Sequence, residues 1–190
     1  HLWIVEPAAS DPKELNYLFQ YLDERVRAGA KVQGVILTHH HADHIGGVLE
    51  TTQRYGVECW CHTETANRLP FNTKGRLCEG DLLPNTGGRA WQVLFTPGHA
   101  PGHICLFSPA DKTLVLGDMV AGVGTILIEP NDGDMTRYLD SLQRLHDLEP
   151  SCLLPSHGPA IGGAQTLLSG YISHRLAREQ LVIDALEQES

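Results

Sequence analysis

Short runs of apolar residues recur along the chain, and most are bounded by glycine, proline, asparagine or aspartate. Runs of this kind are typical of buried strands. We therefore predict strands at residues 2–5, 32–37, 57–61, 91–95, 103–107, 114–116 and 152–154. The polar residues of greatest chemical interest directly follow several of these runs.

Between the strands, the apolar residues change to a helical spacing. Ser10 or Asp11 caps one predicted helix, which carries Pro12 in its first turn and ends at Gly29. Residues 135–148 form another, because four leucines share one of its faces: Leu139, Leu142, Leu145 and Leu148. Further helices are predicted at 45–55, at 63–69 and from 164 onward. This alternation predicts an α/β fold.

The strongest chemical signal is Thr38-His39-His40-His41-Ala42-Asp43-His44, which directly follows the apolar run 32–37. Imidazole and carboxylate are side chains that zinc accepts as ligands. On a helix, His39 and His41 would point about 200° apart, so both can reach one ion only from an extended turn. The pattern favours a metal site over the alternative, a polar surface loop.

Three further segments place a candidate ligand after a predicted strand and beside a glycine, which allows a tight turn. They are Thr96-Pro97-Gly98-His99, Gly117-Asp118 and Pro155-Ser156-His157-Gly158. Each alone is typical of an ordinary turn or cap. Together with the histidine-rich segment, they favour a metal site assembled from turns that are far apart in the sequence.

The series HxHxDH, PGH, GD and SHG, in this order, resembles the metallo-β-lactamase superfamily over nearly the whole chain. The resemblance implies a four-layer αβ/βα sandwich with a metal site at one edge, between the two sheets. It implies that His39, His41 and His99 bind one metal, that Asp43, His44 and His157 bind a second, and that Asp118 bridges both. His41 replaces the Glu of the flavo-di-iron branch, so redox chemistry is disfavoured.

Such a site would hold two divalent metal ions, zinc first, with Mn²⁺ or Fe²⁺ as alternatives. A pair of cations lowers the pKa of a shared water, and Asp43 or Asp118 can orient that water or take its proton. The expected function is a metal-dependent hydrolase acting on an ester-type bond. Phosphodiester and thioester bonds are the leading options.

The tail, with Tyr171-Ile172-Ser173-His174-Arg175 followed by Arg178-Glu179-Gln180, resembles the lactamase-β-2-like branch. That branch includes an endoribonuclease acting on single-stranded RNA, and related enzymes release acyl chains from carrier-protein thioesters. The expected substrate is therefore a small-molecule ester or thioester, or a single-stranded nucleic acid. Tyr171, His174, Arg175 and Arg178 share a helical face. This face either borders the metal cleft and binds a substrate phosphate, or is simply solvated.

Four residues near the motifs are candidates for supporting roles. The hydroxyl groups of Thr38 and Ser156 adjoin predicted ligands and could orient them. His40 lies between two ligands and is expected to point away from the metals. His103 either approaches the site or simply begins the next strand.

Three other interpretations stay open. A thioesterase of the glyoxalase II type shares the HHHADH and PGH motifs, but the Cys-Gly-Arg run expected after Asp118 is absent from this sequence. Single-iron persulfide dioxygenases share fewer of the ligands. A non-catalytic, metal-stabilised interaction module is the alternative of another class. A purely structural zinc needs only four ligands, so seven candidates for two metals speak against it.

Length, composition and charge narrow the picture further. The 190 residues suit a single domain, residues 1–190. Relatives usually carry an extra strand pair before the first motif and, in this branch, a winged-helix module after the tail. We therefore expect a fragment that lacks the N-terminal strands and the C-terminal module. The net charge of −9 argues against a broad polyanion-binding surface.

The cysteines and the apolar residues bear on location. Five scattered cysteines without a CxxC pair indicate reduced thiols and a cytoplasmic protein. Cys59 and Cys61, two apart on one predicted strand, are expected to be buried on the same face. No apolar run is long enough to span a membrane, so no membrane association is expected. The sequence carries no signal for the oligomeric state.

Overall fold

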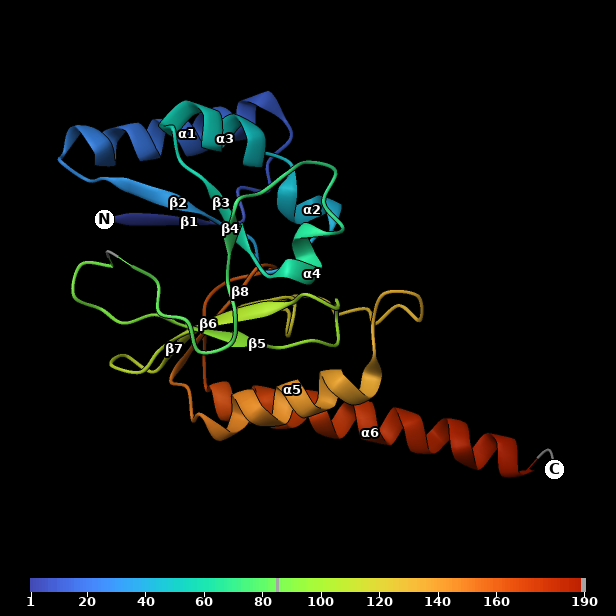
Figure 1. The fold of residues 1–190 in the computed structure, drawn as a ribbon. Helices are drawn as coiled ribbons and strands as arrows, with labels where there is room; N and C mark the ends of the chain where they lie inside the picture. The colour runs from blue at the N-terminus through green and yellow to red at the C-terminus, as the bar shows by residue number, and fades with distance from the viewer. Residues whose placement is uncertain (85, 189–190) are drawn as a thin grey trace.

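Two β-sheets lie face to face in the computed structural model, which describes residues 1–84 and 86–188 (Figure 1). The first sheet is parallel, in the order β1 (Leu2–Val5), β2 (Val32–Ile36), β3 (Cys59–Cys61) and β4 (Gly75–Arg76). The second has the order β5 (Gln92–Phe95), β6 (Ile104–Ser108), β7 (Thr113–Gly117), β8 (Cys152–Pro155) and β9 (Ile161–Gly162). In it only β7 and β8 run parallel.

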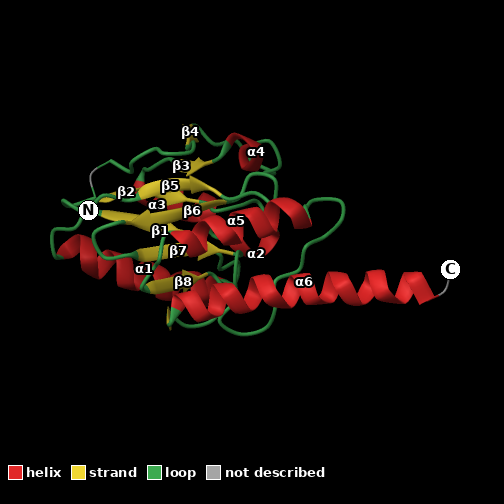
Figure 2. Cartoon of the chain, turned by 90° about the horizontal axis from the view of Figure 1, so that it is seen from below, coloured by secondary structure: helices red, strands yellow, loops and turns green. Residues whose placement is uncertain are grey.

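Helices cover the outer faces of both sheets. The helices α1 (Pro12–Arg27) and α3 (Val48–Tyr55) lie over the first sheet, and α5 (Met135–Asp147) and α6 (Ala164–Gln188) lie over the second (Figure 1). Figure 2 shows α6 running on past the end of α5, away from the sheets. The two short helices, α2 (Ala42–Ile45) and α4 (Thr63–Ala66), lie beside the ends of the first sheet. The predicted four-layer sandwich is confirmed.

Each space between layers holds its own apolar cluster, because side chains alternate across a strand. In β2 and the residue after it, Val35 and Leu37 pack toward α1 and α3, whereas Ile36 packs between the sheets. The central cluster also includes Val93, Ile104 and Leu106 of the second sheet. The leucine face predicted for residues 135–148 packs on the other side of that sheet, through Leu142 and Leu145.

Most predicted elements form near their predicted bounds. Asp11 caps α1 by accepting hydrogen bonds from the next turn, and Gly56 ends α3 in the left-handed conformation. Cys59 and Cys61 are both buried in β3, as expected. The predicted helix 45–55 was wrong at its start, because α2 ends at Ile45 and α3 begins only at Val48. The two-residue strands β4 and β9 were not predicted, since so short a segment has no periodicity.

β1 forms one edge of the first sheet, and its outer side pairs with no strand among the described residues. Within the same residues, no helix combines the length and the apolar character needed to cross a membrane. The turns after β2, β5, β7 and β8 approach one another at one end of the two sheets, and they carry the predicted ligands.

Candidate metal centre

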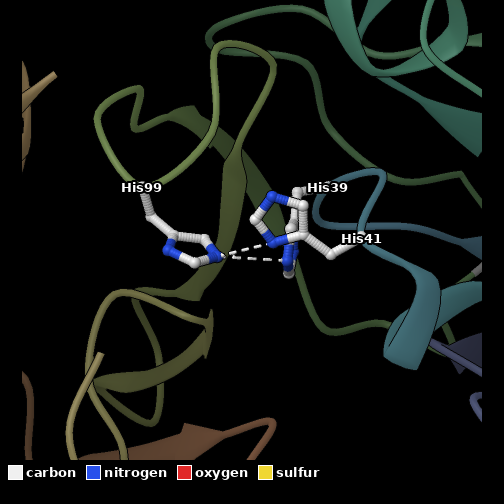
Figure 3. Close-up of side chains that lie close together, drawn as sticks. All are labelled: His39, His41 and His99. Carbon is white, nitrogen blue, oxygen red and sulfur yellow. Dashed lines mark hydrogen bonds between the residues drawn. The ribbon is translucent and has the colours of Figure 1, made fainter. Parts of the chain in front are cut away.

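Three histidine rings meet at the end of the sheets. The Nε2 atom of His99 lies 3.3 Å from Nε2 of His39 and 3.0 Å from Nδ1 of His41. Figure 3 shows the rings turned toward one another, His99 from one side and the other two from the turn after β2. His39 and His99 are buried and His41 is half-buried. We call these residues the tri-histidine group.

Each ring of this group uses its other nitrogen in a hydrogen bond that fixes the proton there. His39 Nδ1 donates to the Thr38 hydroxyl at 2.9 Å, His99 Nδ1 to the Leu127 carbonyl at 2.9 Å, and His41 Nε2 to the Asp132 carboxylate at 2.9 Å. The Thr38 hydroxyl can only accept here, because it donates its own hydrogen to Glu6. The three nitrogens that face inward therefore present lone pairs to one another, an arrangement that a cation stabilises.

A second group consists of Asp43, His44 and His157. The Asp43 carboxylate lies 3.6 Å from Nε2 of His44 and 3.4 Å from Nε2 of His157. His44 donates through Nδ1 to Glu6 at 3.0 Å, and its buried Nε2 has no hydrogen-bond partner among the described residues. Asp43 is exposed and open to solvent. We call these residues the Asp-His-His group.

Asp118 lies between the two groups. Its Oδ2 atom is 3.6 Å from Nε2 of His99, 3.5 Å from Nε2 of His44 and 3.5 Å from Nε2 of His157. Its Oδ1 atom is buried without a hydrogen-bond partner among the described residues. The structure thus brings all seven predicted ligands together, from four separate turns, with the predicted bridging carboxylate in the middle. Metal binding by these residues stays a prediction.

His103 approaches the site and positions Asp118; the sequence alone left open whether it does so or simply begins the next strand. The backbone N–H of Asp118 donates to Nε2 of His103 at 3.1 Å, and Nδ1 of His103 donates to the Thr96 hydroxyl at 2.9 Å. Complete burial lowers the pKa of His103 to about 3, so the ring stays neutral and accepts that bond. Gly117 makes the turn with a φ of 53°.

Glu6 supports both the turn after β2 and the turn after β8. Its carboxylate accepts hydrogen bonds from the hydroxyls of Thr38 and Ser156, from the Thr38 backbone N–H at 3.3 Å, and from His44. The Thr38 hydroxyl thus contacts the candidate ligand His39 directly, whereas the Ser156 hydroxyl is linked to His44 only through Glu6. The sequence reasoning missed Glu6, although it follows β1 as directly as the predicted ligands follow their strands.

The electrostatics separate the buried histidines into two kinds. Burial, together with the neighbouring histidines, holds the pKa of His39 well below its usual value, and burial also lowers that of His99. For His44, burial lowers the pKa, but the carboxylates of Asp118 and Glu6 outweigh it and raise the pKa to about 10. A cation that binds Nε2 of His44 at neutral pH must therefore displace a proton.

With this geometry described, comparisons with known proteins identify the family. The family model described as metallo-β-lactamase superfamily matches residues 4–157. The chain belongs to the metallo-β-lactamase superfamily. The matched segment contains all four turns that bring the seven residues together.

Individual relatives agree with this assignment. The beta-lactamase-like protein 2 homolog of Caenorhabditis elegans is 26% identical over 180 residues, or 94% of this chain and 60% of that protein. A beta-lactamase domain protein from Burkholderia ambifaria superposes with a TM-score of 0.82 at 27% identity, covering 96% of this chain and 67% of its own. The chain spans only 53–60% of the length of the first two curated relatives that it matches.

A third relative bears on the metal. TTHA1623, solved in a di-iron-bound form, superposes with a TM-score of 0.67 at 25% identity, over 85% of this chain and 84% of its own. The spacing of the candidate ligand atoms in the present chain also suits divalent cations. Ligand atoms about 2.0–2.1 Å from a tetrahedral ion lie roughly 3.3 Å apart, the spacing found in the tri-histidine group. Three buried side-chain atoms lack a hydrogen-bond partner among the described residues, and two of them, His44 Nε2 and Asp118 Oδ1, would gain one from a bound cation.

The metallo-β-lactamase centre opens into a cleft of about 570 Å³. Candidate ligands His41, Asp43, His99, Asp118 and His157 line one side of it. The other side is formed by residues 121–129, which we call the cleft loop; of these, Ala121, Val123–Leu127 and Glu129 line the cleft. The site is therefore accessible to a substrate.

Among the described residues, none of α6 lines this cleft, but His174 and Arg175 line two other cavities that share Thr125 with it, so phosphate binding by this face stays a prediction. Two side chains of α6 also form hydrogen bonds with the backbone of the cleft loop. The Tyr171 hydroxyl accepts from the Ala121 N–H at 3.0 Å, and Arg175 donates to the Ile126 carbonyl. Arg175 also stacks on the Tyr138 ring. These contacts involve Tyr171 and Arg175, two of the four residues on the helical face considered for phosphate binding.

Asp132 is the other supporting residue that the sequence reasoning missed, since it lies in a loop without a motif. Besides bonding to His41, it lies 3.4 Å from His40 Nε2 and 3.8 Å from Arg68 Nε. His40 is thus outside both candidate metal groups, packed beside this carboxylate, as expected of a residue pointing away.

Substitution of Asp132 tests its support of His41. Because an unsupported His41 ring can rotate away, we expect Asp132→Ala to weaken zinc binding by about tenfold to a hundredfold. Competition of the protein against a chelator of known zinc affinity measures the change. Asp140→Ala, which removes an exposed carboxylate from α5, is the control. Equal zinc affinity of the Asp132 variant and the wild type would show that the bond does not position His41.

Proposed function

We propose that this chain is a hydrolase that uses two divalent metal ions to cleave an ester-type bond. The observation that carries the proposal is the position of Asp118, whose carboxylate lies within 3.6 Å of histidines from both candidate metal groups. A single structural metal would need neither the second group nor a carboxylate between the two.

Divalent ions bound by these residues supply Lewis acidity and lower the pKa of water toward neutrality. The chain's own residues do the rest. Asp43 and Asp118 both line the cleft, so either carboxylate can orient a water molecule and accept its proton. The hydrogen bonds of Thr38, Leu127 and Asp132 hold the histidine rings in fixed orientations, which keeps the centre preorganised.

The reaction consumes one water molecule. Its oxygen forms a bond to the carbonyl carbon of an ester or thioester, or to the phosphorus of a phosphodiester. The bond to the leaving oxygen or sulfur then breaks, and the leaving group takes up a proton. No serine or cysteine nucleophile is required. Burial keeps the pKa of the Cys105 thiol high, at about 12, which makes it a poor nucleophile.

Zinc is the proposed metal, with manganese or iron as alternatives. Neutral imidazole and carboxylate suit all three ions. The similarity to TTHA1623, which was solved in a di-iron-bound form, supports iron as one of the alternatives. The substrate is proposed to be a small ester or thioester or a single-stranded nucleic acid, and the protein is proposed to act in the cytoplasm.

A paired assay tests the proposed function. The protein is stripped with a chelator, reloaded with zinc, manganese or iron, and assayed on acyl thioesters and on single-stranded RNA. We expect turnover of at least one substrate class, only after reloading, with close to two metal ions bound per chain. Less than one bound ion and no turnover of either class would instead support the non-catalytic interaction module.

A further inference from the structure

The cleft loop exposes two large apolar side chains beside the metal centre. Val123 is 74% exposed and Leu127 is 64% exposed, and both line the cleft that His99 and Asp118 also line. Exposed apolar side chains are common on protein surfaces, and singly they indicate nothing. These two are different because they flank the place where the scissile bond must lie.

Hydrogen bonds to α6 and to two candidate ligands hold this loop at three of its residues. Ile126 is buried in the core under α5 and α6, and its carbonyl accepts from Arg175. The Leu127 carbonyl accepts from His99 at 2.9 Å. At the start of the loop, the Gly122 N–H donates to the His157 carbonyl at 2.7 Å. Two candidate metal ligands therefore bond directly to the loop, and the exposure of Val123 and Leu127 is built into the site.

The charge of the cleft also favours an apolar ligand over one with several phosphates. None of the lining residues that the structure describes is lysine or arginine, whereas Asp43, Asp118 and Glu129 are carboxylates. Nucleic-acid binding depends on lysine and arginine contacts to several phosphates around the one that reacts. Two bound cations could attract one phosphate, but the basic side chains of His174, Arg175 and Arg178 line two other cavities, which share Thr125 with this cleft.

We propose that the cleft loop is a binding site for the apolar acyl chain of an uncharged carboxylic ester or thioester. This inference rests on the proposed function and adds the substrate class to it. Val123 and Leu127 determine specificity by covering the acyl chain, while Asp43 and Asp118 orient the water molecule that attacks the carbonyl carbon. Hydrolysis adds water across the acyl C–S or C–O bond and releases a carboxylate and a thiol or alcohol.

A chain-length series tests the proposal. Zinc-loaded protein is assayed on N-acetylcysteamine thioesters of acetate, butyrate, hexanoate and octanoate, which share one uncharged leaving group. We expect kcat/KM to rise roughly twofold to fourfold for each methylene that the loop covers. The near-isosteric double variant Val123→Thr, Leu127→Asn should reduce the octanoyl-to-acetyl ratio of kcat/KM about tenfold or more.

Leu49→Asn is the matched control. Leu49 is 54% exposed on α3, away from the cleft, and its replacement should leave the ratio unchanged. Binding of octanoate and acetate, measured by calorimetry on wild type and the double variant, gives a second readout that does not require turnover. We expect octanoate to bind more tightly than acetate, and the double variant to lose the difference.

The outcomes separate this inference from the proposed function. Thioester hydrolysis that is independent of chain length, with no effect of the double substitution, would overturn the acyl site and leave the hydrolase intact. Cleavage of single-stranded RNA without a preference for octanoate would overturn it in favour of a nucleic-acid substrate. Absence of any turnover would contradict the proposed function, and the octanoate titration would still decide whether the loop binds an acyl chain.

Discussion

Asp118→Ala is expected to reduce hydrolysis by about three orders of magnitude or more, the largest effect of any single substitution in the site. The carboxylate touches both candidate metal groups, so its loss removes a ligand and the residue that orients water together. Burial alone would raise the pKa of Asp118, but the positive charge of His44, 3.5 Å away, outweighs burial and lowers the pKa below its usual value. The group is therefore ionised at neutral pH, as a ligand must be.

Metal content and rate, measured on the same preparation, make this test specific. We expect the variant to retain the secondary structure of the wild type, seen by circular dichroism, and to bind fewer than two zinc ions. Asp118→Asn keeps the size of the side chain but loses its charge. Its metal content and rate should lie between those of the wild type and Asp118→Ala. Asp147→Ala removes an exposed carboxylate at the end of α5 and should change neither quantity. Two bound ions together with a wild-type rate in Asp118→Ala would rule out the bridging role.

The sequence was sufficient to predict which residues come together at the candidate metal centre, because most of them lie near the ends of strands. A buried strand such as β2 is visible as an apolar run, and the first polar residue after it must leave the sheet at its end. Strands that stack in two sheets bring such residues to one place, even when His39 and His157 are far apart in the chain. A position just after a strand therefore predicts the location of His39, Asp118 and His157, whereas Asp43 and His44 lie on α2, the short helix that follows β2.

The supporting residues obey no such relation. Asp132 reaches His41 from an irregular loop, and the Leu127 carbonyl that holds His99 is a backbone group that any residue could supply. For α6, helical spacing correctly groups Tyr171 with Arg175, but spacing says nothing about what a face meets. That face meets the cleft loop through Tyr171 and Arg175, a partner that spacing alone could not predict. Periodicity predicts which side chains are neighbours on one element, and tertiary packing decides their partners.

Gly117→Ala is expected to lower the free energy of unfolding by about 2–4 kcal/mol, although it adds only one methyl group. Gly117 has a φ of 53°, a conformation that any residue with a Cβ adopts at a cost. An added Cβ would lie 2.5 Å from His103 Nε2 and 2.5 Å from the Thr38 hydroxyl oxygen. Both neighbours are fully buried, so neither can move aside without breaking its hydrogen bonds.

The same substitution should also weaken metal binding, because the atom it displaces is the acceptor for the Asp118 N–H. Thermal unfolding with and without zinc separates the two effects: the variant should unfold earlier as the metal-free protein and gain less from zinc than wild type does. Gly170→Ala is the control, since its Cβ would meet nothing within 4 Å on α6, and it should stabilise the protein by up to about 1 kcal/mol. If Gly117→Ala matches wild type in stability and in zinc-dependent stabilisation, the contact between His103 and Asp118 does not set the position of the bridging carboxylate.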